Sequence, residues 1–481
     1  MDSAIMHAST GEAESNLIMT PAEERKLVRK IDLHLIPLMF ILYLFQYLDK
    51  TSLGYTAIMG ILQDAVSLPA TQTITLSQKL VGTQYSWVSS FFYVGFLAAS
   101  PLSSILLVKF SAAKVVVVTV LIWAGIQMCM AAGNSFGSLA ALRILLGAFE
   151  AAVSPGFTII TSTWYKPSEH ALRHGLWYGG ASVATIFGGI LAYAVSHIHS
   201  AIKTWQFLFI IFGAATFLWG LIVMWLLPDN PQTAWFLSER ERKMAFARVQ
   251  GARHSTETRK WNHGQMREAL MDPRSWLLFL LCVFTTLPGG GLTAFGSVVL
   301  KSFGYSVLQT QLLTMSQGAF LLLYVVLTVV VSVTFKNARC VSIALLNLIS
   351  LAGALMIKLL PDAFPTILSL VSSNITGHTK KSTVNGMLFV GFCVGYIVGP
   401  LTFLPGEAPA YKTAFNTMIA CFVLNVTIII VMRQLMARWN KKRDQEFGAE
   451  TSSSGQAVED IAAQLGLDET DWENKSIRYS L

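Results

Sequence analysis

Four charged residues interrupt stretches of sequence that are otherwise apolar. Asp49 and Lys50 lie in the first apolar stretch, and Arg143 and Glu150 lie in the fourth. A charge at the middle of a bilayer costs about 2.5–3.5 kcal/mol, so such residues face a partner or a water-filled path rather than lipid. Two acids and two bases in this setting predict a pathway for a solute, together with groups that can carry protons.

The spacing of Arg143 and Glu150 places both side chains on one face of a helix. At about 100° per residue they lie about 20° from eclipsed, and about 10.5 Å apart along the axis. Asp49 and Lys50 point about 100° apart, so each can meet a different residue of the other helix. We expect Lys50 to pair with Glu150, and Arg143 to pair with Asp49 in one state of the protein.

These pairs have two possible roles. A pair that breaks and re-forms can take up and release protons, because a nearby cation changes how readily a buried carboxyl group binds a proton. An anionic substrate arriving at Lys50 or Arg143 would free the carboxylates and so couple anion entry to proton entry. The alternative is a structural salt bridge that only locks the two helices together. Glu150→Gln separates the two, because a simple lock leaves proton-driven uptake unchanged.

The composition is typical of a membrane protein with many spans. Of the 481 residues, 53% are hydrophobic and only 13% are charged, and the mean hydropathy is +0.54. Apolar runs of about 20 residues predict transmembrane helices. Most of the lysines and arginines fall in loops that we place in the cytosol, together with both termini. The net charge of +8 therefore predicts no nucleic-acid partner.

The apolar runs form two sets of six, separated by a polar and basic segment. We expect spans at 35–57, 84–107, 114–132, 139–161, 173–196, 205–227, 276–299, 312–334, 340–360, 363–374, 383–404 and 413–436. This pattern predicts an all-α membrane protein with two six-helix bundles around a central cavity. The expected divisions are an N-terminal tail with an amphipathic helix (1–34), a first bundle (35–227), a cytosolic linker (228–275), a second bundle (276–436) and a C-terminal tail (437–481).

The segment before the first span has the signals of a helix start. Thr20 and Glu23 form a capping box, with proline at the first helical position. Leu27, Ile31 and Leu35 follow at intervals of four residues and so share one face. We expect this amphipathic helix to lie on the membrane and to lead into the first span.

Two segments depart from the regular pattern of spans. Residues 65–79 lengthen the first outer loop with polar, threonine-rich sequence. The tenth expected span, 363–374, is about 20 Å long as a helix, which is short of a hydrocarbon core of about 30 Å. Either this span is a broken half-helix, or about one helix of sequence is missing.

Glycines and aromatic residues supply further candidates for the substrate site. Residues 289–291 are three glycines that follow Pro288, and such a run predicts an unwound segment whose carbonyl groups face a cavity. Gly290 is therefore a candidate substrate-binding residue. Trp177 and Tyr396 are candidates for the cavity wall, although most aromatic residues in membranes serve in packing.

Five stretches carry a family resemblance, and they are IDLHLIPLMFILYLFQYLDKTSLGYTAIMGI, RILLGAFEAAVSPGF, LPDNPQTAWFLSERE, GGLTAFGSVVLKSFGY and SLVSSNITGHTKKSTVNGMLFVG. With them, residues 25–445 resemble the major facilitator superfamily and, within it, the fungal allantoate permease group of the anion:cation symporters. The resemblance implies proton-coupled uptake of small carboxylates or related metabolites, of which allantoate, nicotinate, pantothenate and biotin are typical.

The resemblance also implies roles for single residues. Asp49 and Glu150 fall on the family's proton-coupling acids, and Lys50 and Arg143 fall on its substrate and coupling cations. The chain departs from the usual pattern of the group at four positions that are expected to face the cavity: Ser100, Ala181, Thr185 and Tyr396.

We therefore expect a secondary active transporter for a small organic anion or vitamin-like carboxylate. Its expected partners are this substrate, protons and the lipid bilayer, and its expected place is the plasma membrane, as a monomer. It should use the proton gradient and no cofactor, and the sequence has no motif that predicts an enzyme. Two alternatives stay open: an exporter of a secondary metabolite on the same fold, and a nutrient receptor that does not transport.

Overall fold

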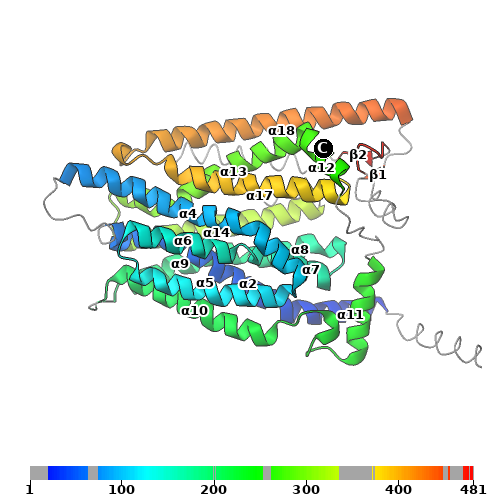
Figure 1. Cartoon of the computed structure of the whole chain (residues 1–481), viewed down its shortest axis with the longest axis horizontal. Helices are drawn as coiled ribbons and strands as arrows, with labels where there is room; N and C mark the ends of the chain where they lie inside the picture. The colour runs from blue at the N-terminus through cyan, green and yellow to red at the C-terminus, as the bar shows by residue number, and fades with distance from the viewer. Residues whose placement is uncertain are drawn as a thin grey trace, which may run out of the picture.

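The structure is a computed structural model that describes residues 20–62, 74–198, 200, 202–252, 262–334, 371, 374–447, 453–454, 470–475 and 477–479. Long helices run side by side along its longest axis (Figure 1). The elements are α2 (Pro21–Thr56), η1 (Ala57–Ile61), α4 (Ile74–Lys109), α5 (Ala112–Cys129), η2 (Met130–Ala132), α6 (Phe136–Glu150), α7 (Val153–Trp164), α8 (Pro167–Tyr178), α9 (Gly180–Val195), α10 (Thr204–Leu226), η3 (Pro231–Thr233), α11 (Glu239–Ala252), α12 (His263–Met271), α13 (Pro273–Ser302), α14 (Val307–Thr334), α17 (His378–Leu401), η4 (Pro405–Glu407) and α18 (Lys412–Phe447), with two short parallel strands, β1 (Ser453–Ser454) and β2 (Ile477–Arg478).

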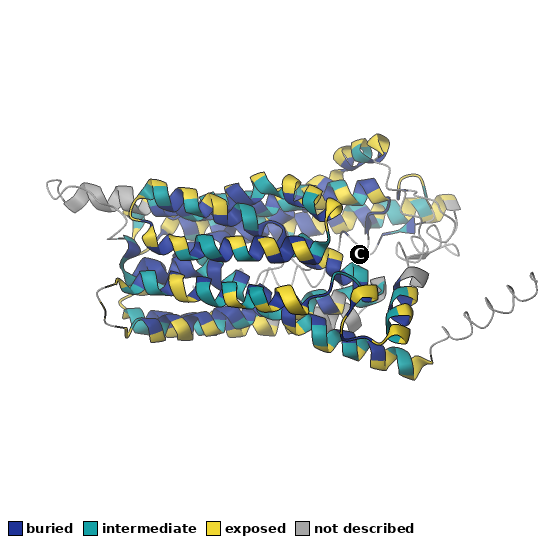
Figure 2. Ribbon diagram, turned by 60° about the horizontal axis from the view of Figure 1, so that its bottom comes forward, coloured by how far each residue is buried: buried dark blue, intermediate teal, exposed yellow. Residues whose placement is uncertain are grey.

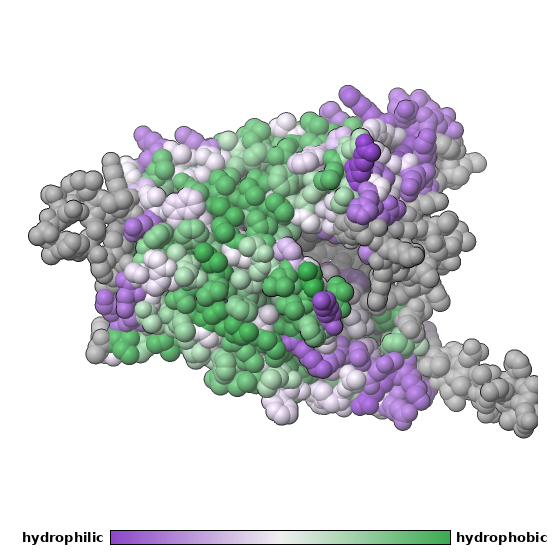
Figure 3. Space-filling model, viewed as in Figure 1, coloured by the Kyte–Doolittle hydropathy of each residue, from purple (hydrophilic) through white to green (hydrophobic). Residues whose placement is uncertain are grey.

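The helices confirm an all-α membrane protein. Nine helical stretches of the described residues are long and apolar enough to cross a membrane. Hydrophobic residues form a band across the middle of the molecule, and polar residues gather at its two ends (Figure 3). Residues on the outside of the helices are exposed, whereas those between helices are buried (Figure 2). The expected spans at 340–360 and 363–374 lie outside the described residues, apart from Val371 and Asn374.

The beginning of α2, the helices α11 and α12, and strand β2 lie at the same end of the molecule (Figure 1). We call this end the terminal face and the opposite end the distal face. Near the distal face the two halves of the chain are in contact. Lys301 donates a hydrogen bond to the carbonyl oxygen of Ile58 at 3.2 Å, and the hydroxyl of Tyr85 donates to that of Ala294 at 2.6 Å.

The fourth span breaks directly after one of the four charged residues. Helix α6 ends at Glu150, two turn residues follow, and α7 begins at Val153. Pro155 explains the break, because it has no N–H to donate to the carbonyl group of Ala151, and its ring crowds that carbonyl group. Glu150 therefore lies directly before an interruption in the helical hydrogen bonding of this span.

The amphipathic helix leads into the first span as expected, but its apolar face is covered by protein, which we did not expect. Helix α2 starts with the predicted capping box and continues without a break into the first span. Leu27, Ile31 and Leu35 are fully buried in the core of the first bundle. That core includes Phe236 and Met244 from the segment between the two bundles. The apolar face of the helix therefore has a protein partner, which the spacing of leucines alone could not reveal.

The expected outer loop at 65–79 is also shorter than predicted. Helix α4 begins at Ile74, so residues 74–79 are its first turns, while residues 65–73 lie outside the described residues. Threonine, serine and glutamine lower helix propensity only slightly, and no proline occurs between Pro69 and Pro101. Polar composition was therefore a poor signal for the end of this helix.

Helices α4 and α6 touch backbone to backbone at two glycines. A Cβ atom on Gly147 would lie 1.9 Å from the carbonyl oxygen of Phe92, and one on Gly95 would lie 2.0 Å from that of Ile144. No side chain fits in such a contact, which is typical of small residues at helix crossings in membranes. The crossing sets the position of α6, and with it the positions of Arg143 and Glu150.

We expect Gly147→Ala to force α4 and α6 apart and to lower the free energy of unfolding by about 1–3 kcal/mol, as overpacking does in well-packed cores. The melting temperature of the purified protein in detergent measures this effect. Gly125→Ala is the matched control, because a Cβ atom there meets nothing within 4 Å. Equal melting temperatures for the two variants would contradict the close crossing.

Candidate functional site

The four charged residues of the first and fourth spans all face the interior of the protein. Asp49 and Glu150 are 0% exposed and Arg143 is 2% exposed, while the side chain of Lys50 keeps 15% exposure. Helix α2 supplies Asp49 and Lys50, and α6 supplies the other two. None of the four side chains points toward the lipid-facing surface, as the cost of charge in a bilayer predicts.

The expected pair of Lys50 and Glu150 is present. The Nζ atom of Lys50 lies 2.7 Å from Oε1 of Glu150. Gln46, one helical turn before Lys50, donates a hydrogen bond to the same oxygen at 2.9 Å. Lys50 also lies 5.8 Å and 5.7 Å from the ring centres of Phe92 and Phe96. The pair is thus a desolvated ion pair with an aromatic wall on one side.

We expected Asp49 to pair with Arg143 in one state of the protein, but its partner in this structure is Trp123. Its carboxylate accepts a hydrogen bond from the indole N–H of Trp123 on α5. Its Oδ1 atom has no hydrogen-bond partner among the described residues, and no ion pair joins it to Arg143 there. Ser52 and Gln127 extend this polar cluster, because Gln127 donates to the hydroxyl of Ser52 at 3.2 Å. Asp49 therefore has one free carboxylate oxygen available for a proton or a cation.

Arg143 is the unusual member of the four. Its Nε and Nη2 atoms are buried and have no hydrogen-bond partner in the part of the chain that the structure describes. Buried polar groups are nearly always hydrogen-bonded, and a buried donor of a charged group without an acceptor costs more than a neutral one. A guanidinium with free donors presents a planar fork that matches a carboxylate. The chemistry of this position is that of an anion-binding group.

The glycine run in the seventh span does not unwind, so that expectation was wrong. Helix α13 is continuous across residues 289–291. The glycines instead allow close packing, since a Cβ atom on Gly290 would lie 2.7 Å from the Cα atom of Tyr396 on α17. The ring of Tyr396 stacks on Tyr93 of α4, with 4.5 Å between ring centres. Gly290 thus positions Tyr396 against the first bundle.

Trp177 lies on α8, in the aromatic core of the first bundle. Its ring lies 5.0 Å from that of Tyr43 and 5.5 Å from that of Phe157, in edge-to-face contacts. Its indole N–H is buried and has no hydrogen-bond acceptor among the described residues. Trp177 therefore has a clear packing role, and its contact with substrate stays a prediction.

Sequence reasoning missed the neutral residues that hold the acids in place, namely Gln46 and Trp123. Gln46 is four residues before Lys50 and so lies on the same face of the helix, which was a usable signal. Trp123 offered no such signal, because a tryptophan in an apolar span more often serves in packing or at the membrane interface. Only the packing of α5 against α2 reveals that its N–H reaches Asp49.

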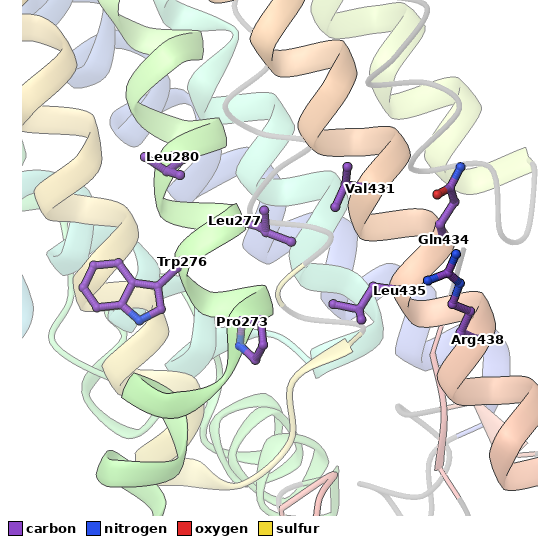
Figure 4. Close-up of a pocket in the computed structure, with 8 residues that line it drawn as sticks. All are labelled: Pro273, Trp276, Leu277, Leu280, Val431, Gln434, Leu435 and Arg438. Atoms are coloured by element: carbon purple, nitrogen blue, oxygen red, sulfur yellow. The ribbon is translucent and has the colours of Figure 1, made fainter.

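A pocket of about 420 Å³ lies elsewhere, between α13 and α18 (Figure 4). It is lined by Pro273, Trp276, Leu277, Leu280, Val431, Gln434, Leu435 and Arg438. Several of these side chains are among the exposed hydrophobic residues on the outside of the second bundle. The pocket contains none of the four charged residues, so we do not assign the substrate to it.

Comparisons with known proteins identify the family of this chain. The family model of the Major Facilitator Superfamily matches residues 39–432. An uncharacterized transporter, C417.10, of Schizosaccharomyces pombe is 34% identical over an alignment of 478 positions, which covers 96% of this chain and 90% of that protein. The allantoate permease of Saccharomyces cerevisiae is 33% identical over an alignment of 511 positions, including gaps, which covers 98% of this chain and 89% of that protein.

Solved structures show the same fold at low sequence identity. The xylose transporter XylE from E. coli, in an inward open conformation, matches with a TM-score of 0.61 and 13% identity, over 84% of this chain and 95% of that chain. A bacterial homolog of the human lysosomal transporter Spinster matches with a TM-score of 0.58 and 14% identity, over 83% and 96% of the two chains. The chain is thus a multi-pass membrane transporter and not an enzyme, and it belongs to the major facilitator superfamily, in the fungal allantoate permease group.

Proposed function

We propose that this transporter takes up a small organic anion together with protons. The observation that carries the proposal is Arg143, a buried guanidinium whose Nε and Nη2 atoms have no acceptor among the described residues. A substrate carboxylate would supply the missing acceptor in a planar, paired geometry. Similarity to a protein named allantoate permease supports a carboxylate substrate.

The charged residues have distinct roles in this proposal. Arg143 binds the substrate carboxylate, and Lys50 provides a second positive charge next to it. When the anion draws Lys50 away from Glu150, the carboxylate loses its counter-ion and binds a proton more readily. Asp49, with one oxygen free, is the second proton-coupling acid. Entry of the anion and entry of the proton then favour each other, which is the requirement for symport.

The remaining predicted residues shape the site. Tyr396, placed by Gly290 and stacked on Tyr93, joins the two bundles and forms an aromatic wall. Trp177 packs against Tyr43 and Phe157 in the core of the first bundle. We further propose that the protein works as a monomer in the plasma membrane with both termini in the cytosol. The proton gradient drives transport without a cofactor.

Proteoliposomes that contain a trapped pH-sensitive dye test this function. We expect one of the small carboxylates allantoate, nicotinate, pantothenate and biotin to acidify the lumen when the outside is acidic, and to accumulate there as radiolabel. Collapse of the proton gradient with an uncoupler should abolish the accumulation. Substrate flux that does not depend on the proton gradient would contradict proton coupling. The absence of flux with all four carboxylates would contradict the proposed substrate class.

A further inference from the structure

The end of the chain folds back onto the terminal face of the second bundle. The described residues 470–475 and 477–479 contact helices α12, α13, α17 and α18. Strand β2 and helix α12 lie at the same end of the molecule (Figure 1), and β2 contacts α18 through Arg443 and Asp444. We call residues 470–479 the C-terminal segment. It lies outside the membrane-spanning helices, and its contacts are independent of the substrate site.

The centre of this contact is the carboxylate of Asp471, which lies between two buried cations. One oxygen lies 2.8 Å from Nζ of Lys380, at the start of α17. The other is paired with the guanidinium of Arg274, at the start of α13, and accepts a hydrogen bond from the hydroxyl of Tyr479 at 2.8 Å. The side chains of Asp471, Lys380 and Arg274 are at most 1% exposed. A single acid of the segment therefore joins the ends of two helices.

Further contacts make this surface specific for the segment. Arg443 of α18 donates to the carbonyl oxygens of Asp471 and Ile477, both at 2.7 Å. Asn440 forms two hydrogen bonds of 2.9 Å with the backbone of Tyr479, one in each direction. Lys380 also lies 5.0 Å from the ring centre of Trp472. The helices therefore contact the backbone, a carboxylate and an aromatic ring of the C-terminal segment.

The charges of this surface call for an acid from outside the helices. Arg274, Lys380 and Arg443 carry three positive charges, whereas Asp272 and Glu268 supply two negative charges. The carboxylate of Asp471 completes the balance. Without an acid in that position Arg274 and Lys380 share the carboxylate of Asp272, Lys380 also keeps Glu268, and the set of charges is left with one uncompensated positive charge, which is unfavourable in a buried setting. The surface therefore fits an acidic peptide turn.

The apolar core below this surface does not depend on the segment. Leu278, Leu281, Val384 and Ile429 form its centre and all belong to helices, and the segment adds only Tyr479. Helix α13 also packs directly against α17 and α18. The second bundle can thus keep its core when the segment leaves.

The segment also holds part of the connection between the two bundles. The hydroxyl of Thr470 donates to Glu268 of α12 at 2.8 Å, and Lys380 of α17 lies 2.6 Å from the same carboxylate. The other half of the connection, α11, is held on the first bundle by Arg248, which pairs with Glu24 at 2.8 Å. Each half of the linker is therefore fixed to a different bundle.

We propose that the terminal face of the second bundle is a receptor for the chain's own C-terminal segment, and that this segment is a separable latch that holds α12 against α13 and α17. Asp471 is the residue that the receptor recognises. The latch is closed in this structure.

The latch should stay closed at neutral pH. Burial alone would raise the pKa of Asp471, but the charges of Arg274 and Lys380 outweigh this effect and lower it below the ordinary value. A carboxyl group with a lowered pKa in the docked state contributes stability above its free pKa, and this stability is lost as the pH falls through the docked pKa. Removal of the carboxylate by mutation, rather than mild acid, is therefore the way to open the latch.

A binding experiment with a truncated chain tests the receptor. The chain is ended after residue 452, and a fluorescent peptide of residues 466–481 is added to the purified protein in detergent. We expect saturable binding by fluorescence anisotropy, at least tenfold weaker for the Asp471→Asn peptide. The Asp468→Asn peptide, with the same change in charge, is the matched control and should bind as well as the unchanged peptide. Equal binding of all three peptides, or no binding to a monodisperse truncated protein, would overturn the proposal.

A second experiment uses the full-length chain and does not depend on the folding of the truncated one. In the Asp471→Asn variant, trypsin should cleave after Lys475 at least tenfold faster than in the unchanged protein, and the Asp468→Asn variant should behave like the unchanged protein. A cleavage rate unaffected by Asp471→Asn would show that the segment is not held by this residue. Neither readout involves substrate, so the latch and the transport function can fail separately.

Discussion

Arg143→Ala should strongly reduce uptake of the anionic substrate while the protein keeps its fold. Loss of one partner from a desolvated, charged contact costs about 2–5 kcal/mol, so we expect uptake at subsaturating substrate to fall by at least about 30-fold. Initial rates of uptake into proteoliposomes measure this effect. The substrate is whichever radiolabelled carboxylate among allantoate, nicotinate, pantothenate and biotin is transported.

The stability of the same variant separates substrate binding from a structural role. The Nε and Nη2 atoms of Arg143 have no acceptor among the described residues, so alanine removes a buried charge whose donors are unsatisfied. We therefore expect an unchanged or higher melting temperature in the absence of substrate. A residue that only locked two helices would lower it by several degrees. Normal uptake combined with a large loss of stability would contradict the assignment of Arg143 to the substrate.

Arg143→Lys is the matched control for charge. Lysine keeps the positive charge but lacks the planar fork that binds a carboxylate with two parallel hydrogen bonds. We expect its uptake to lie between that of the unchanged protein and that of Arg143→Ala. Full activity of the lysine variant would indicate that charge alone attracts the anion.

The broad design of this protein was readable from its sequence because it follows from the cost of exposing polar groups to lipid. Apolar runs predict the spans, and charged residues inside them must face inward, so the sequence correctly predicted the pair of Lys50 and Glu150. Helical spacing placed Arg143 and Glu150 on the same buried face. These inferences need only the polarity of single residues and the helical repeat of about 3.6 residues per turn.

Other features depend on contacts between distant parts of the chain, and the sequence could not predict them. Trp123 meets Asp49 only because α5 packs on α2, and Asp471 meets Arg274 only because the end of the chain returns to α13. The glycine run at 289–291 was misread for a related reason. Glycine allows both the unwinding of a helix and the close packing of two helices. Here the backbone of Tyr396 packs closely against Gly290, so the glycines serve in packing.

The ion pair of Lys50 and Glu150 allows a test that separates proton coupling from a structural lock. Glu150→Gln keeps the shape of the side chain but leaves Lys50 without its carboxylate, and breaking a buried pair in this way destabilises a protein by about 3 kcal/mol or more. Since Lys50 keeps 15% exposure, we expect the lower end of that range. The melting temperature should fall, and proton-driven accumulation of substrate should be lost.

The double variant Lys50→Met with Glu150→Gln then distinguishes the two roles. Replacement of both partners removes the unpaired charge, so we expect most of the lost stability to return. Proton-driven accumulation should not return, because the group that carries the proton and the second cation of the substrate site are both missing, whereas a simple lock would leave accumulation intact in both variants. Exchange of labelled for unlabelled substrate, measured at equal pH on both sides, shows whether binding survives. If Glu150→Gln alone accumulates substrate normally against a proton gradient, Glu150 does not couple protons and the pair is only a lock.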